Sequence, residues 1–348
     1  MKLPQVHQLL KDRHIDALIL VGEDPMIPYL TGIWLESGSW MEHCMLIITR
    51  QKTMLLVREL EIERLRKATS LPVLPLANIQ LNSLVKKSMA VNGDAITVNE
   101  LRRIRHGKVH DLSKQLRSLR LVKTPEELRR LQIACRYTDE IFAACLKRFA
   151  YFRHEQEVKD YLAAEAKKRG CSLSFDTIVA SGKDAALPHY SGSKKLARGF
   201  CVIDFGLRYK GYCSDMTRTI FLGTPSRKEV HVYELVQSAN EAGIKAAVPG
   251  AVAADVDKAA RSLLGPYARR FIHALGHQVG VAVHDAGFAI SSSSSDRLQA
   301  NMVITIEPGV YEAGRFGIRI EDDLIVGEKP LILTKTSKQL KIIVSKNF

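Results

Sequence analysis

The chain has 348 residues, of which 46% are hydrophobic and 25% charged, with a formal net charge of +14 at pH 7. This composition excludes collagen-like and disordered chains, and the length allows two globular domains that each bury a core. The N-terminal segment lacks the uninterrupted apolar core of a signal peptide, because charged residues between Lys11 and Asp16 interrupt it. No apolar run approaches the roughly 18 to 20 residues that span a bilayer. We therefore expect a cytoplasmic protein without a membrane partner.

The first third of the chain alternates helical and extended patterns. An amphipathic stretch over residues 3–11 predicts a helix, and short apolar runs over 17–21, 44–49 and 54–57 predict strands. This alternation is typical of an α/β domain, which we place at residues 1–122.

Basic residues gather between positions 101 and 130, where ten Lys or Arg stand against three acidic residues. The local excess of seven positive charges is half of the net charge of +14. The basic residues that precede position 121 are Arg102, Arg103, Arg105, Lys108, Lys114, Arg117 and Arg120. They have no interleaved aromatic residues and no nucleic-acid motif, so we expect a solvated basic surface near a domain junction and no nucleic-acid partner. An anionic partner is the alternative.

A second domain is predicted to begin at residue 123. Thr124 is followed by Pro125 and, three residues after the cap, by Glu127, which is a capping box with proline at the first helical position. A second capping box joins Ser226 to Glu229, and residues 251–264 predict a further helix. Apolar runs over 200–205, 217–222, 302–306 and 318–320 predict strands. The segment 123–348 is therefore expected to be α+β.

Two aspartates flank a predicted hairpin turn at Tyr209 and Lys210. If the strands meet about this turn, Asp204 and Asp215 sit opposite each other on one face. Adjacent carboxylates repel one another, and a divalent cation between them removes the repulsion. The alternative is a pair of surface aspartates beside a turn.

Further along the chain, His273, His277 and His284 lie within 12 residues among small and apolar side chains. Neutral imidazole binds metals and can donate a hydrogen bond to a developing oxyanion. Glu307 and Glu321 follow on two strand-like pieces, with Arg319 two residues before Glu321 and on the same face. Strand-end glutamates and an ion pair are the ordinary interpretation. Taken together, four carboxylates and one imidazole suit hard or borderline divalent ions.

These segments resemble the metal-binding signature of the pita-bread-fold metallopeptidases, the family of prolidase, aminopeptidase P and methionine aminopeptidase. The resemblance covers roughly residues 124–330 and implies a creatinase/prolidase-like N-terminal domain before a pita-bread catalytic domain. The implied metal ligands are Asp204, Asp215, His277, Glu307 and Glu321. They imply two divalent ions per subunit, manganese first, with cobalt, iron or zinc as alternatives. Asp215 and Glu321 would bridge the ions, and a bridging water would become the nucleophile.

The resemblance also implies substrate-binding and supporting residues. The segment from Leu187 to Tyr190 matches the one whose histidine, here His189, lines the substrate pocket, and His284 would contact the scissile carbonyl region. Glu307 would carry the proton to the leaving proline nitrogen. The residues implied to support the site from its edge are His273, Tyr311 and Arg319.

The implied reaction is hydrolysis of the Xaa-Pro bond at the N-terminus of peptides, a bond that lacks an N–H and fits ordinary clefts poorly. Asp285 and the segment 286–288 lack an arginine that some prolidases place near there for a dipeptide carboxylate. This favours an Xaa-Pro aminopeptidase, with Xaa-Pro dipeptidase as the alternative.

Three other interpretations carry less weight. Methionine aminopeptidase shares the ligands but lacks the first domain, and creatinase-like enzymes lack the metal set. A non-catalytic, peptidase-like binding protein is an alternative of another class, but such relatives have lost ligands that this chain retains. The resemblance further implies a homodimer or homotetramer.

Overall fold

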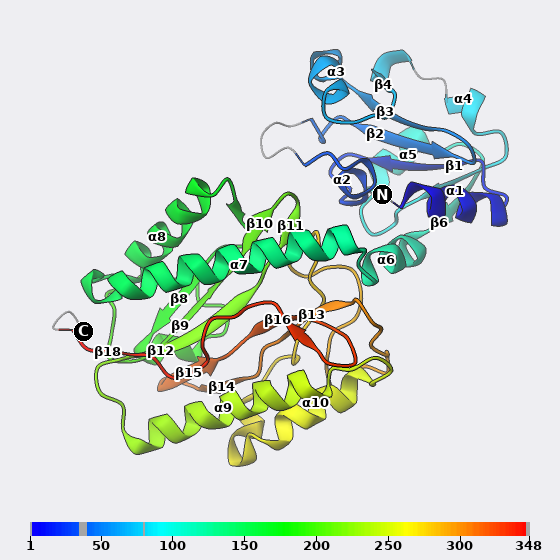
Figure 1. Ribbon diagram of the computed structural model, residues 1–348. Coiled ribbons are helices and arrows are strands. Elements are labelled where there is room, and N and C mark those ends of the chain that lie inside the picture. The colour runs from blue at the N-terminus through cyan, green and yellow to red at the C-terminus, as the bar shows by residue number, and fades with distance from the viewer. Residues whose placement is uncertain (1, 35–39, 79–80, 346–348) are drawn as a thin grey trace. The chain divides into compact units, whose positions relative to one another are not determined.

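A computed structural model describes residues 2–34, 40–78 and 81–345. The chain divides into two compact units, residues 1–119 and 120–348, which are coloured blue to cyan and cyan to red in Figure 1. No helix formed by the described residues combines the length and apolar character that crossing a lipid bilayer requires.

The first unit is built on one six-stranded sheet with the order β4-β3-β2-β1-β5-β6. Its strands are β1 (Ala17–Val21), β2 (Met45–Thr49), β3 (Thr53–Val57), β4 (Val73–Pro75), β5 (Ser88–Val91) and β6 (Lys108–Asp111). Its helices are α1 (Leu3–Asp12), α2 (Met26–Thr31), α3 (Glu59–Arg66), α4 (Leu81–Leu84), α5 (Val98–Ile104) and the start of α6 (Ser113–Leu121), with a short 3₁₀ turn at Leu76–Asn78. The strand β1 is buried along its whole length, as a central strand covered on both faces should be. The predicted α/β class is confirmed.

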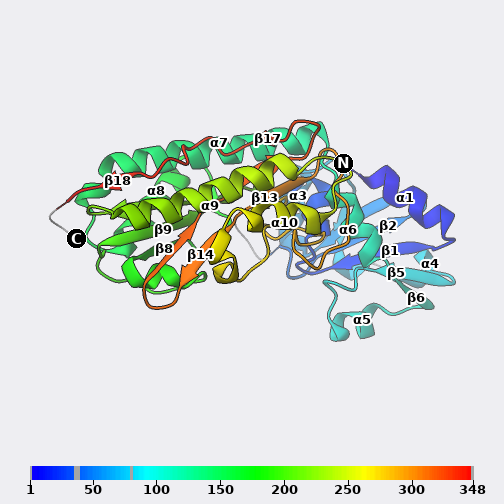
Figure 2. The same ribbon diagram turned by 90° about the horizontal axis from the view of Figure 1, so that it is seen from below.

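Four helices frame the second unit: α7 (Pro125–Arg148), α8 (Glu155–Lys168), α9 (Arg227–Ala246) and α10 (Ala253–Ser262). Both predicted capping boxes are present, at Thr124 with Glu127 and at Ser226 with Glu229. Figures 1 and 2 show α7 and α8 on one side of the strands and α9 and α10 on the other. Short 3₁₀ turns lie at Phe149–Tyr151, Gly182–Ala186 and Gly265–Arg270.

The strands of this unit form small sheets between the helix pairs. One sheet has the order β18-β12-β9-β8. The others have the orders β11-β10-β7, β13-β16-β17 and β14-β15. The bounds are β7 (Ser172–Leu173), β8 (Ile178–Ser181), β9 (Gly199–Phe205), β10 (Leu207–Tyr209), β11 (Tyr212–Cys213), β12 (Met216–Leu222), β13 (Val303–Ile306), β14 (Gly309–Glu312), β15 (Phe316–Arg319), β16 (Asp322–Ile325), β17 (Leu331–Ile332) and β18 (Ile342–Ile343). The α+β class predicted for this part of the chain is confirmed.

The hairpin that carries the two aspartates turns one residue later than predicted. Lys210 and Gly211 occupy the turn, with φ of 45° and 84°. Because the register therefore shifts by two residues, Asp204 stands opposite Thr217 rather than opposite Asp215. Asp215 lies two residues before Thr217 along the same chain direction, so both aspartates still reach one face as diagonal neighbours.

Glu307 and Glu321 occupy matching breaks in a second, bent hairpin. On one side of the break Ile306 pairs with Asp322, and on the other side Gly309 pairs with Arg319. At the break the N–H of Glu307 donates to Leu275 and the N–H of Glu321 donates to Thr217. At these two glutamates the backbone N–H therefore bonds to another segment of the chain and not to the opposite strand of the hairpin.

The predicted basic surface is only partly solvated. Its members up to Arg117 are exposed, but Arg120 is 7% exposed and its side chain forms an ion pair with Asp285. The prediction was therefore wrong for Arg120, because its partner lies far along the chain. All six cysteines are buried, and none forms a disulfide.

Candidate functional site

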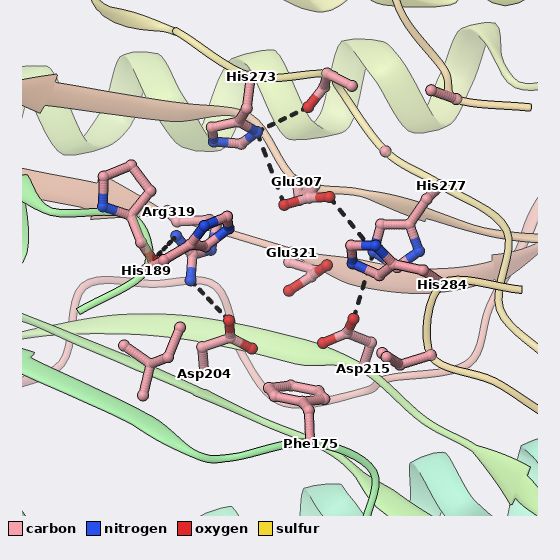
Figure 3. Close-up of a pocket in the computed structure, with 16 residues that line it drawn as sticks. Phe175, His189, Asp204, Asp215, His273, His277, His284, Glu307, Arg319 and Glu321 are labelled. Carbon is pink, nitrogen blue, oxygen red and sulfur yellow. Dashed lines mark hydrogen bonds and ion pairs between the residues drawn. The ribbon is translucent and has the colours of Figure 1, made fainter. Parts of the chain in front are cut away.

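One cavity of about 380 Å³ in the second unit collects nearly all the predicted site residues. Those that line it are His189, Asp204, Asp215, His273, His277, His284, Glu307, Arg319 and Glu321. In Figure 3, His277 and His284 stand at one end, His189 at the other, and Phe175 lies beneath the aspartates. Tyr311 is buried outside the lining and hydrogen-bonds to His273 and Arg319.

Three of these side chains are placed so that they can share one metal ion. A ligand atom from each of Asp215, His277 and Glu321 lies within 4.8 Å of the others. His277 Nε2 is 3.5 Å from Asp215 Oδ2 and 3.6 Å from Glu307 Oε1. The Nδ1 of the same ring faces the Gln278 carbonyl oxygen at 3.3 Å. A neutral ring with its proton on Nδ1 therefore turns the Nε2 lone pair toward the carboxylates, as a metal ligand requires.

The carboxylates of the cavity are buried close together, and little in the protein offsets the repulsion between them. Asp204 Oδ1 and Asp215 Oδ1 are buried without a hydrogen-bond partner. Burial, followed by repulsion from Asp204, raises the pKa of Asp215 well above its usual value, and burial with repulsion from Asp215 does the same for Glu321. Burial raises the pKa of Glu307 to about 7. Divalent cations would relieve both the repulsion and the missing contacts, so the residues fit such ions.

Arg319 organises the opposite wall of the cavity. Its Nη2 donates to Asp204 Oδ2 over 2.7 Å, its Nε to Thr217 Oγ1 over 3.0 Å, and its Nη1 to the Tyr311 hydroxyl over 2.8 Å. Thr217 in turn donates to Glu321 Oε2 over 2.7 Å. One arginine thus orients two carboxylates, one directly and one through a hydroxyl.

The ring of His273 is held in one tautomer. Its Nδ1 lies 2.8 Å from the Ala274 carbonyl oxygen, which only accepts hydrogen bonds, so Nδ1 carries the proton. Nε2 then accepts from the Tyr311 hydroxyl over 3.0 Å. Burial lowers the pKa of His273 to about 4, and the positive charge of Arg319 adds to this shift. The imidazole is therefore neutral near pH 7.

Sequence patterns missed three residues that hold the candidate metal ligands in place. Besides Thr217, the Thr305 hydroxyl accepts from the His277 N–H over 3.0 Å, and Asp323 Oδ2 accepts from the Asp215 N–H over 2.8 Å. Thr305 is two residues before Glu307 and Asp323 two after Glu321, so same-face spacing along a strand was the available signal.

The loop that carries His189 is anchored by one buried carboxylate. Glu155, at the start of α8, accepts hydrogen bonds from the Ser181 N–H and hydroxyl, the Tyr190 hydroxyl and the Lys194 N–H. Its exposed fraction is 0%. His189 itself is exposed on this fixed loop and forms the end wall of the cavity.

Asp285 does not line the cavity. Its carboxylate, 2% exposed, forms a buried ion pair with Arg120 and lies 3.8 Å from Lys123 Nζ. The residues 286–288 are also absent from the described lining. The segment 285–288 therefore contributes no side chain to the cavity lining, so the geometry does not support its use to separate aminopeptidase from dipeptidase action.

Comparisons with known families agree with this architecture. Residues 129–328 match the model described as metallopeptidase family M24, and residues 2–122 match the one described as the creatinase/prolidase N-terminal domain. A cavity walled by carboxylates and imidazoles, in a chain of this domain composition, defines a metal-dependent peptide hydrolase. The chain belongs to metallopeptidase family M24.

Relatives match along nearly the whole chain. The Xaa-Pro dipeptidase of Pyrococcus horikoshii is 32% identical over 356 residues, which cover 97% of this chain and 98% of the relative. An Xaa-Pro dipeptidase structure from Bacillus anthracis has a TM-score of 0.88 at 28% identity and covers 98% of this chain and 99% of its own. The X-Pro aminopeptidase structure from Thermotoga maritima has a TM-score of 0.86 at 29% identity. It covers 95% of this chain and 98% of its own. The expected family, the pita-bread fold and the hydrolase class are confirmed.

Proposed function

We propose that this enzyme hydrolyses the peptide bond between an N-terminal residue and a following proline. The observation that carries the proposal is the 32% identity to an Xaa-Pro dipeptidase over 97% of the chain. The cavity supports it, because all five expected ligands line it. Relatives named for dipeptidase and for aminopeptidase action both match. The proposal therefore covers Xaa-Pro dipeptides and longer Xaa-Pro peptides.

The metal ligands of this proposal are the five residues expected from the sequence. Asp204, Asp215, His277, Glu307 and Glu321 would hold two divalent ions, manganese first, with Asp215 and Glu321 shared between them. Such ions, when bound, supply an activated water as the nucleophile and polarise the scissile carbonyl. The orphaned oxygens of Asp204 and Asp215 support this assignment, because each is buried and has no protein partner.

The remaining roles belong to side chains around the ligands. Glu307, which lines the cavity and lies 3.6 Å from His277 Nε2, would carry a proton to the departing proline nitrogen. His284 packs against His277 with ring centroids 4.1 Å apart, and burial lowers the pKa of His284. A neutral His284 can donate a hydrogen bond to the carbonyl oxygen of the scissile bond. His189 would close the substrate end of the cavity.

Assembly and location stay predictions. We infer a homodimer or homotetramer from the family resemblance stated above, and the cytoplasmic location stays an expectation. Sedimentation of the purified protein tests the assembly.

The test of the function uses matched peptides after EDTA treatment and reconstitution with manganese, cobalt, iron or zinc. We expect hydrolysis of Ala-Pro, Ala-Pro-Ala or both, and no hydrolysis of Ala-Ala or Ala-Ala-Ala. Metal-loaded protein that cleaves neither proline peptide contradicts the proposal. Equal cleavage of the alanine peptides contradicts the proline requirement.

A further inference from the structure

Basic residues gather at one edge of the first unit's sheet. The strands β5 and β6 run parallel to β1, and β2 runs antiparallel to it, so the segments before β1, β5 and β6 and after β2 share this edge. These segments are 11–16, 86–87, 105–108 and 50–52, and we call them together the basic edge. Their basic residues are Lys11, Arg13, Arg50, Lys52, Lys86, Lys87, Arg105 and Lys108, against two acidic residues, Asp12 and Asp16.

Hydrogen bonds hold the four segments against one another. The Asp16 carboxylate accepts from the N–H groups of residues 86–88 over 2.7 to 3.1 Å, and it pairs with Arg50 over 3.1 Å. The N–H of Lys108 donates to the carbonyl oxygen of Lys87 over 3.0 Å. The basic edge is therefore one fixed surface, although its parts come from four separate places along the sequence.

The positive charge of the basic edge is not balanced by nearby carboxylates. Among the described residues, Arg50 is the one member of the eight with a carboxylate partner, and the other seven side chains are exposed. The loops that follow β1 and β5 at the opposite edge, residues 22–25 and 92–97, hold Glu23, Asp24 and Asp94 and no lysine or arginine. Such a separation of charge produces a positive potential at the basic edge, which attracts an anionic partner.

The chemistry of the basic edge suits the phosphate backbone of a nucleic-acid duplex. Its segments contain no Phe, Tyr or Trp, and their one large apolar residue, Ile15, is buried. Protein partners need an apolar centre to the interface, stable membrane anchoring adds an apolar group to a basic patch, and single strands are held by stacking on aromatic rings. A duplex instead presents closely spaced phosphates, which lysine and arginine contact without reading the bases.

We propose that the basic edge binds double-stranded nucleic acid through its phosphate backbone, without sequence preference. This binding is separate from peptide hydrolysis, because no residue of the basic edge lines the cavity of the second unit. The basic run over 101–130 did not predict such a partner, because only Arg105 and Lys108 of the basic edge belong to it. The other six cations come from three segments that the sheet brings together.

Fluorescence anisotropy with a labelled duplex of about 20 base pairs at about 50 mM salt tests the proposal. We expect binding with similar Kd values on two duplexes of unrelated sequence. The logarithm of the binding constant should fall with the logarithm of the salt concentration with a slope of about −3.5 or steeper, for about four or more contacted phosphates. No binding, or a shallower slope, overturns the inference. Equal or tighter binding to single-stranded DNA, to polyglutamate or to phosphatidylserine vesicles also overturns it.

A pair of charge-reversal variants locates the surface. Lys87→Glu/Lys108→Glu lowers the net charge by four, two for each substitution, and Arg58→Glu/Lys114→Glu makes the same change after the ends of β3 and β6, at the opposite edge. The first variant should raise Kd at least about tenfold and reduce the salt slope by about 2, whereas the second should raise Kd less than about threefold. Equal weakening in both overturns the inference, because net charge alone would then hold the duplex.

Circular dichroism checks that both variants are folded. If the charge reversal prevents folding, Lys87→Gln/Lys108→Gln removes the same two positive charges without adding negative ones, and should still reduce the salt slope by about 2. An unchanged slope in this neutral variant overturns the inference.

Discussion

The hydroxyl of Thr217 donates a hydrogen bond to the carboxylate of Glu321 over 2.7 Å, across 104 positions of sequence. Thr217 stands opposite Asp204 in the β9–β12 pair, and Arg319 donates to its hydroxyl from the other side. A threonine thus occupies the centre of the hydrogen bonds that orient the predicted ligands. Its effect on catalysis should be large although it touches no substrate.

Replacing Thr217 tests this role. Thr217→Val removes the hydroxyl at nearly constant volume, so Glu321 loses its orienting donor, and kcat/KM on Ala-Pro should fall about 10- to 100-fold with a comparable loss of metal affinity. Thr217→Ser keeps the hydroxyl and is the matched control, which should retain most activity. Calorimetric metal titration and steady-state kinetics measure the two effects. Wild-type metal affinity in Thr217→Val would contradict the assigned role.

The buried pair of Asp285 with Arg120 should matter for stability. Asp285→Asn leaves the buried charge of Arg120 without its carboxylate partner, and should lower the free energy of unfolding by about 3 to 5 kcal/mol. Glu126→Gln, which removes an exposed carboxylate paired with Arg129 and Arg130, is the control and should leave the free energy of unfolding nearly unchanged. Urea unfolding monitored by circular dichroism measures both. Similar small losses in the two variants would show that the buried pair contributes little.

Asp322 should give the stability a pH dependence in acid. Burial acts to raise the pKa of this carboxyl, but the ion pairs with Arg218 and Lys338, at 2.6 and 3.0 Å, hold it below its usual value. Because the folded pKa is lower than the unfolded one, the stabilisation is present above about pH 4 and is lost as the pH falls through the folded pKa. The difference in urea midpoint between wild type and Asp322→Asn should therefore narrow as the pH falls from about 6 to about 3. A difference that stays constant over this range would contradict the account.

Features set by neighbouring residues were predictable from the sequence. The capping boxes at Thr124 and Ser226 determine where α7 and α9 begin, and both were found from their side-chain spacing alone. The cavity residues were found because they stand in short segments with recognisable neighbours. Fold and candidate ligands therefore follow largely from local patterns and family resemblance.

Features set by pairing across the chain were not predictable. A turn at Lys210 and Gly211, one residue later than expected, moved the partner of Asp204 from Asp215 to Thr217. The bond between Arg120 and Asp285 joins positions 165 apart, and nothing near either residue indicates the other. Such contacts depend on how segments cross in space, which sequence spacing does not encode.

The most direct measurement of the central claim follows metal content and Ala-Pro hydrolysis together as manganese is added to EDTA-treated protein. We expect no hydrolysis without metal, two ions bound per subunit at saturation, and hydrolysis that rises as the sites fill. Glu321→Ala should bind fewer than two ions and lose activity, because the carboxylate that would be shared is gone. Full hydrolysis by metal-free protein, or full activity and two bound ions in Glu321→Ala, would contradict the account.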